Sequence, residues 1–358
     1  MLSRVADCLF WMSRYIERAE NNARILDVNL QLMLDFETQS EADVRRHWAP
    51  IINSLEEHEL FHTFYEQADG TSVVEFVTFE QKNPNSIFSC LSRARENARG
   101  VREQISSEMW EHINALYLFI RSSEARELFQ SSSYQFYKRI LEGSFQFLGI
   151  TDATMTHGEG WDFCQLGKFI ERADRTSRIL DVKYHILLPS GERVGGNVDT
   201  VQWMAVLRSC SALEAYRKLY VGEIAPWKVA EFLILHDCFP RALRHCVHQV
   251  DHALHRISGV AEDRFSNEAE RLSGKLRGDL DYTRIGEIFQ YGLHQYLDRL
   301  QLRLSEIGNS MGEIYCEIAP QPQPPPPAQS QGQKQSQSGG GAQSQSQSQT
   351  QGFAIPTC

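Results

Sequence analysis

The sequence lacks any apolar run approaching the ~20 residues that a helix needs to cross a bilayer. It also lacks the apolar stretch of a secretory signal, because Asp7 lies where that stretch would have to be. Its 8 cysteines include no Cys-x-x-Cys pair. Scattered cysteines of this kind are typical of a reducing compartment rather than of a disulfide-stabilised domain. We therefore expect a cytoplasmic protein without a membrane-spanning segment.

Positive charge is also in short supply, since 36 Lys and Arg face 46 Asp and Glu for a net charge of −10. Nucleic acids and anionic membranes select basic surfaces, so neither is expected as the main partner. The sequence contains no G-x-x-x-x-G-K-[ST], no G-x-G-x-x-G after a strand and no G-x-S-x-G. Phosphate-loop, dinucleotide-binding and serine-hydrolase functions therefore have no support, and no cofactor is expected.

No segment alternates apolar and polar residues with a period of two, so the expected fold class is all-α, a bundle of about a dozen helices. Thr71–Gln81 has the β-branched and aromatic composition of a strand, but its helical surroundings favour a short helix. The other expected helices span about 3–36, 41–69, 86–102, 110–121, 124–147, 161–188, 199–220, 226–235, 240–257, 264–277 and 281–315.

What the sequence does contain is an internal repeat. Residues 14–28 read RYIERAENNARILDV and residues 168–182 read KFIERADRTSRILDV, with nine of fifteen positions identical at an offset of 154. Both copies carry apolar residues on two faces at helical spacing, which is typical of a buried helix. We therefore expect two related helices, near 9–34 and 163–188, within one helical domain of residues 1–318. A weaker third echo of Asn22-Ala23-Arg24 occurs at Asn97-Ala98-Arg99.

Charged residues lie between the apolar faces of both copies, and each copy contains a Glu-Arg dipeptide, Glu17-Arg18 and Glu171-Arg172. Leaving one partner of a buried ion pair alone typically costs ~3–5 kcal/mol, so these charges should be paired. Two interpretations remain open: an ion-pair network that locks the two helices together, or a polar cleft that binds a carboxylate, a phosphate or a peptide. The candidate residues are Arg14, Glu17, Arg18, Glu20, Arg24, Asp27, Arg99, Glu171, Arg172, Asp174, Arg178, Asp181 and Arg241.

A catalytic role for these carboxylates is not expected. An Arg follows both Glu17 and Glu171, and a neighbouring guanidinium lowers the pKa of a carboxyl group. A carboxylate of that kind is a poor general acid near neutral pH. We therefore assign no catalytic residue.

Two histidine patterns offer metal chemistry as an alternative. His58, Glu59 and His62 fit H-E-x-x-H, which on a helix places two imidazoles on one face beside a glutamate base, as in zinc hydrolases. No third ligand with recognisable spacing follows. Four further histidines, at 245, 248, 252 and 255, lie opposite the apolar stripe of one predicted helix, which favours a solvated face or a polar helix contact.

The composition changes abruptly after Ala319. Residues 319–352 consist mainly of Pro, Gln, Ser and Gly, and such a segment cannot bury enough apolar area to offset its chain entropy. We expect residues 319–358 to be disordered. The final residues, FAIPTC, are interpreted as a frayed terminus or as a short apolar tag that docks on a partner.

Several segments, in this order along the chain, resemble the bacterial alpha-E domain family, which is named for a predicted all-helical domain with a repeated Glu-Arg motif. They are MLSRVADCLFWMSRYIERAENNARIL at 1–26, SIFSCLSRARENARGVR at 86–102, WDFCQLGKFIERADRTSRILD at 161–181 and FPRALRHC at 239–246. The resemblance covers about residues 1–318. Ala242 stands where it leads us to expect a serine after Arg241, so no role for a hydroxyl group is carried over.

The resemblance also implies a working context. Members of the family look like companions of circularly permuted ATP-grasp proteins, which resemble carboxylate–amine ligases, and of transglutaminase-like peptidases. It implies a non-enzymatic helical accessory protein of an amide-ligase system that holds the ligase or its peptide substrate. A metal-dependent hydrolase and a purely structural scaffold that self-associates into a homo-oligomer are the alternatives.

Overall fold

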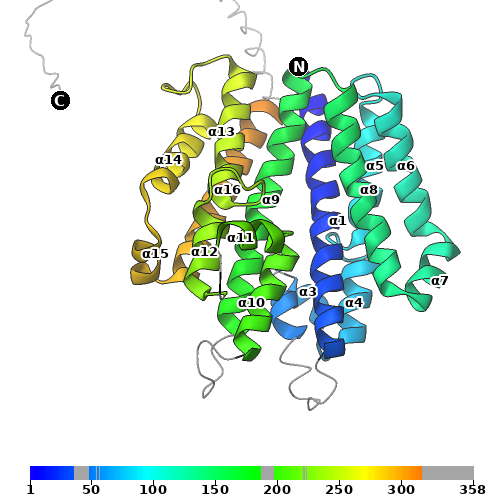
Figure 1. The fold of residues 1–358 in the computed structure, drawn as a ribbon. Helices are drawn as coiled ribbons and strands as arrows, with labels where there is room; N and C mark the ends of the chain where they lie inside the picture. Colours follow the sequence, from blue (N-terminus) through cyan, green and yellow to red (C-terminus); the bar gives the residue numbers. More distant parts are fainter. Residues whose placement is uncertain are drawn as a thin grey trace, which may run out of the picture. The chain divides into compact units, whose positions relative to one another are not determined.

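The computed structural model describes residues 1–35, 48–186 except 54 and 56, and 197–316 except 221 and 223. The chain divides into two units, residues 1–318 and 319–358. The tail, its final FAIPTC and the loop at 187–196 lie outside the described residues, so the disorder predicted for the tail stays a prediction. Within the described residues all regular structure is helical, which confirms the all-α fold class (Figure 1).

The described residues form α-helices of 5 to 33 residues and a π-helical turn, η1. The helices are α1 Ser3–Asp35, α3 His58–His62, α4 Gly70–Thr78, α5 Ile87–Gly100, α6 Ser107–Arg121, α7 Ser123–Ser131, α8 Ser133–Thr154, α9 Glu159–Ile186, α10 Asn197–Ser209, α11 Leu213–Leu219, α12 Pro226–Leu235, α13 Leu243–Ser258, α14 Glu268–Tyr282, α15 Ile285–Tyr291, α16 Leu293–Met311 and η1 Gly312–Cys316.

The two long helices that contain the repeated segments, α1 and α9, pack side by side at the centre (Figure 1). They run parallel, because the N-terminal amine of Met1 lies 3.1 Å from Glu159 at the start of α9 and Glu17 meets Arg172 a few turns later. Helices α5, α6 and α8 cover one side of this pair, and α13, α14 and α16 cover the other. Each central helix is therefore buried on two faces, as its apolar pattern predicts.

Close approach of α1 and α9 depends on a glycine. A Cβ atom added at Gly167 would lie 2.2 Å from the backbone oxygen of Phe10, so any side chain there would push the two helices apart. Leu9, Met12 and Leu166 fill the space around this crossing and have no measurable exposure. The crossing brings the charged residues of the two helices within hydrogen-bonding distance of each other.

Three of the expected long helices are interrupted, each at a residue that stops a helix locally. The segment expected at 124–147 breaks at Ser132, whose extended backbone and side chain cap the start of α8. The segment at 199–220 breaks near Ser211, with φ of 49°, and the segment at 281–315 breaks at Thr283 and again at Gly292, with φ of 106°.

The other differences from the expected helices are the residues at which two helices start and the structure of residues 48–69. Helix α13 begins at Leu243 rather than at Pro240, and α14 begins at Glu268 because Asn267 caps it. Of the helix expected at 41–69, the described part is helical only at 48–53 and in α3. The short helix expected at 71–81 is confirmed as α4, which starts from a capping box between Asp69 and Ser72. None of the described helices combines the length and apolar character that crossing a bilayer requires.

Candidate functional site

The two Glu-Arg dipeptides of the repeat pair with each other across the crossing of α1 and α9. Arg18 donates from Nε and Nη2 to the two carboxylate oxygens of Glu171, at 2.6 and 2.8 Å. Arg172 donates in the same manner to the two carboxylate oxygens of Glu17, at 2.8 and 2.8 Å. Each glutamate thus binds the arginine of the other copy in a bidentate pair, the strongest geometry for this contact.

Further arginines surround both glutamates. Glu171 also accepts from Arg14 at 2.9 Å and from Arg175 at 3.0 Å, so that three guanidinium groups, with that of Arg18, share one carboxylate. Glu17 also accepts from Arg241 at 2.7 Å. Because Arg241 lies just before α13, this contact ties a third helix to the central pair.

The Arg241 side chain extends the network along α1. Its Nη2 atom donates to both oxygens of Glu20, at 2.9 and 2.8 Å, and Glu20 also pairs with Arg24 one turn further on. The equivalent pair in the second copy is Asp174 with Arg178, at 2.9 and 2.8 Å. We call this set the Glu-Arg network. Its members are Arg14, Glu17, Arg18, Glu20, Arg24, Glu171, Arg172, Asp174, Arg175, Arg178 and Arg241.

The network lies in the interior and its carboxyl groups stay ionised. Glu17 is 2% exposed and Glu171 is 0% exposed. Burial acts to raise the pKa of Glu17, but Arg172 and Arg241 more than offset this effect and hold it well below its usual range. Burial likewise opposes ionisation of Glu171, and Arg18, Arg14 and Arg175 together depress its pKa. Neither group can supply a proton near neutral pH.

Positive charge exceeds negative charge inside the network. Burial and the nearby Arg241 lower the pKa of Arg24, whose carboxylate partner is Glu20. Glu171 raises the pKa of Arg18 against the effect of burial. Among the members named above, four carboxylates contact seven guanidinium groups.

Three of the predicted site residues lie outside the network. Arg99 is exposed on α5 and pairs with Glu96 at 2.7 Å. Asp27 accepts from Gln31 at 2.9 Å, and burial raises its pKa. Asp181 contacts His294 of α16 at 2.7 Å.

Sequence reasoning missed three polar residues that complete the network. Arg175 was not singled out because Asn21 takes its place in the first copy, so comparing the copies gives no signal there. Asn85 accepts from Arg18 and in turn donates to the buried Glu57. The turn that contains Asn85 is visible in the sequence, but nothing in it indicates contact with α1.

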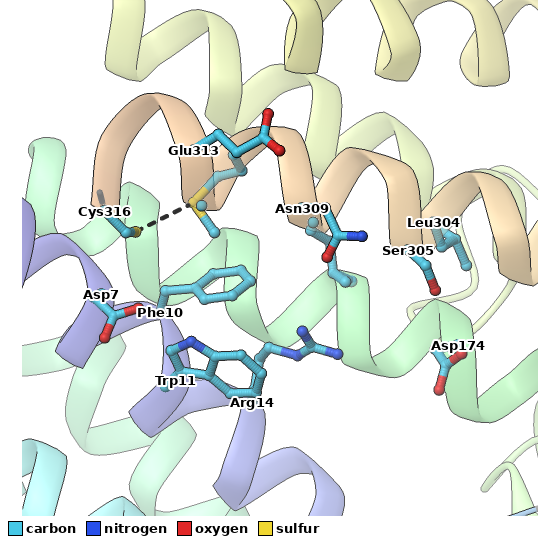
Figure 2. A pocket seen from close by; sticks show the side chains of 14 residues that line it. Asp7, Phe10, Trp11, Arg14, Asp174, Leu304, Ser305, Asn309, Glu313 and Cys316 are labelled. Carbon is cyan, nitrogen blue, oxygen red and sulfur yellow. Dashed lines mark hydrogen bonds between the residues drawn. The ribbon is translucent and has the colours of Figure 1, made fainter. Parts of the chain in front are cut away.

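A pocket of about 560 Å³ opens at the outer edge of the network, between α1, α9 and α16 (Figure 2). Arg14 and Asp174 belong both to the network and to the pocket wall. The π-helical turn η1 closes one end, and such turns are frequent at functional sites. The wall consists of Asp7, Phe10, Trp11, Arg14, Ile170, Asp174, Leu304, Ser305, Gly308, Asn309, Met311, Gly312, Glu313 and Cys316.

The H-E-x-x-H residues occupy the short helix α3 on the surface. The rings of His58 and His62 meet edge to face with centroids 4.4 Å apart, and Glu59 is exposed. Across the described ranges no group of three or more His, Cys, Asp or Glu side chains lies close enough to hold a metal ion. The second histidine pattern makes polar contacts as expected: His248 meets Asp281 and His252 meets Glu262, both at 2.7 Å.

The paired Glu-Arg dipeptides and the all-helical fold agree with the description of one protein family. A family model described as a predicted alpha-helical domain with a conserved ER motif, Alpha-E, matches residues 1–316. The chain belongs to the Alpha-E family. An uncharacterized protein of Mycobacterium bovis and another of Mycobacterium tuberculosis are each 24% identical over 319 residues.

The region that this chain shares with the mycobacterial proteins is a large part of this chain but a small part of those proteins. The aligned region is 85% of this chain but 34% of each mycobacterial protein, so this chain spans about a third of the length of the curated relatives it matches. No solved structure matches this chain.

Proposed function

We propose that this Alpha-E protein is a non-enzymatic helical accessory protein of an ATP-grasp carboxylate–amine ligase system. The supporting observation is that Glu17 and Glu171 are buried and that each accepts hydrogen bonds from more than one arginine. Such groups hold helices in place rather than take part in proton transfer. The pocket beside the network includes Arg14 and Asp174 in its wall and offers a place where a substrate or a partner segment can bind.

The ligase as partner follows from the family resemblance, and the length of the relatives supports it. In the mycobacterial relatives about two thirds of the chain lies outside the region matched by this protein. An Alpha-E region covalently joined to further chain in one organism can associate non-covalently with a separate protein in another. A transglutaminase-like peptidase is the second partner class that the resemblance implies.

Co-purification tests this function. The full chain, tagged, is co-expressed with a circularly permuted ATP-grasp protein from the same genome, and the eluate is analysed by mass and by light scattering. We expect a stoichiometric complex and faster amide formation, measured as ATP-dependent ligation, than with the ligase alone. A chain that elutes as a homo-oligomer and leaves ligase output unchanged would contradict the proposal and favour the structural scaffold.

Variants separate a direct role from loss of folding. Asp7→Asn and Asn309→Ala alter the pocket wall without touching the Glu17 and Glu171 pairs, whereas Arg126→Gln changes an exposed pair with Glu75 far along the chain. We expect the first two variants to weaken the complex or its output while the third behaves as the wild type. Equal behaviour of all three would place the partner elsewhere on the surface.

A further inference from the structure

One face of α1 supplies charges of both signs to the pocket beside the Glu-Arg network. Asp7, Trp11 and Arg14 are spaced by four and three residues, so they lie on the same side of the helix and all line the pocket (Figure 2). Asp7 lies near η1 and Cys316, and the guanidinium of Arg14 lies on the other side of the Trp11 ring. The pocket therefore has an acidic end at Asp7 and a basic end at Arg14, where the Asp174 carboxylate also lines the wall but is bound by Arg178.

The basic end carries positive charge that its own neighbours leave uncompensated. Arg14 uses Nε for Glu171, at 2.9 Å, but that carboxylate also serves Arg18 and Arg175. Within the described part of the chain, the terminal nitrogens of Arg14 have no hydrogen-bond partner. The guanidinium stacks on Trp11, 4.6 Å from the ring centroid, which fixes its orientation. An oriented fork with two free donors matches a carboxylate.

The acidic end carries negative charge without a cation. Among the described residues neither Asp7 nor Glu313 forms an ion pair, although both line the pocket. Burial raises the pKa of Asp7, and contacts with Cys316 and Trp11 oppose that rise. A ligand ammonium group would favour the ionised form of this carboxyl group and would be attracted by both side chains.

The separation of the two ends sets the length of the ligand. Seven residues of α-helix, from Asp7 to Arg14, cover ~10 Å at ~1.5 Å per residue. A charge-assisted hydrogen bond takes up ~2.8 Å at each end, and an extended peptide covers at most ~3.3–3.6 Å per residue, so about two residues bridge the two ends. Trp11 and Phe10 between the ends offer apolar surface for a side chain, and the pocket volume of about 560 Å³ is that of a small-molecule site.

We infer that this pocket binds a free dipeptide, with its terminal ammonium group at Asp7 and Glu313 and its terminal carboxylate at Arg14. The assignment rests on the proposed function for its link to amide ligation, because such a peptide is a substrate or a product of a carboxylate–amine ligase. The site itself follows from the side chains of the pocket.

Dialanine in four forms tests the site on the full chain without any ligase: the free peptide, the N-acetylated peptide, the C-amidated peptide and the peptide blocked at both ends. Isothermal calorimetry at neutral pH and low salt measures each affinity. We expect the free peptide to bind at least about tenfold more tightly than either singly blocked form, since each block removes a charge-assisted contact. Alanine and hexaalanine should bind more weakly than dialanine. Equal affinity for all four forms, or no binding of any form, would overturn the inference.

Two variants assign the ends. Arg14→Gln should abolish the preference for a free carboxylate and keep the preference for a free amine, and Asp7→Asn should weaken the preference for a free amine and keep that for a free carboxylate. Thermal unfolding checks that both variants fold, and Arg126→Gln serves as the matched surface control. Variants that fold and bind all four peptides as the wild type does would also overturn the inference. Peptide binding without ligase binding would refute the proposed function alone.

Discussion

Glu17 on α1 and Arg172 on α9 form a bidentate ion pair with both contacts at 2.8 Å, although 155 residues separate them in the chain. Arg18, which follows Glu17, forms the reciprocal pair with Glu171, which precedes Arg172. Because α1 and α9 run parallel, the Glu-Arg dipeptide of each copy meets that of the other. In this chain the Glu-Arg motif therefore joins the two central helices through two reciprocal ion pairs.

Arg241 should be essential for stability, because it joins the start of α13 to both Glu17 and Glu20. Arg241→Ala removes one guanidinium partner from each of these buried carboxylates, which keep Arg172 and Arg24. We expect a loss of ~3–5 kcal/mol in the free energy of unfolding, measured with urea. Arg244→Ala, three residues later, removes a partly exposed pair with Asp281 and should cost less than ~1 kcal/mol. Similar losses for the two variants would contradict the role of Arg241.

Gly167 sets the distance between the central helices. Gly167→Ala places a Cβ atom 2.2 Å from the Phe10 backbone oxygen, and neither backbone can move without disturbing the ion pairs. We expect destabilisation of at least ~1–3 kcal/mol. Gly149→Ala, on the exposed side of α8 with nothing within 4 Å, should instead stabilise the protein by ~0.4–1 kcal/mol. Chemical denaturation of both variants gives the comparison, and a neutral Gly167→Ala would show that the helices can separate.

Lys168 should lower the stability of the protein near neutral pH. Burial, with a contribution from Arg172, lowers its pKa to about 8 from 10.5. Between these pH values the unfolded chain holds a proton that the folded chain has lost, so this group's contribution to stability rises with pH through the window and is unfavourable below it. The Lys168→Met variant should be more stable than the wild type at pH 7, by on the order of 1–3 kcal/mol.

The pH dependence of that difference is the control. Buried thiols titrate in the same range with the opposite effect, since burial raises the pKa of Cys164 and of Cys246 to about 12. These thiols are common to both proteins, so the difference between Lys168→Met and the wild type isolates the lysine. It should shrink above pH 8 and vanish above pH 10.5. A difference that is constant with pH would mean that Lys168 keeps its proton when folded.

Repetition in the sequence identified the central Glu-Arg pairs but also selected Asp27 and Asp181, which occur in both copies and lie outside the network. The shared Glu-Arg dipeptides, flanked by apolar faces, predicted buried and paired charges before any distance was known. Arg175, Asn85 and Glu57 were not predictable, because only the packing of other segments against α1 and α9 brings them there. Helix breaks were missed for a related reason: Ser132 is compatible with a continuous helix until its side chain is seen to cap the next one.

The most direct test of the reciprocal Glu-Arg pairs is a double-mutant cycle on Glu17 and Arg172, measured as the free energy of unfolding. Glu17→Gln and Arg172→Gln should each cost ~3–5 kcal/mol, because each leaves a buried charge without its bidentate partner. The double variant should cost less than the sum of the two by at least ~1 kcal/mol. Single variants that lose less than ~0.5 kcal/mol, or costs that simply add, would contradict the account.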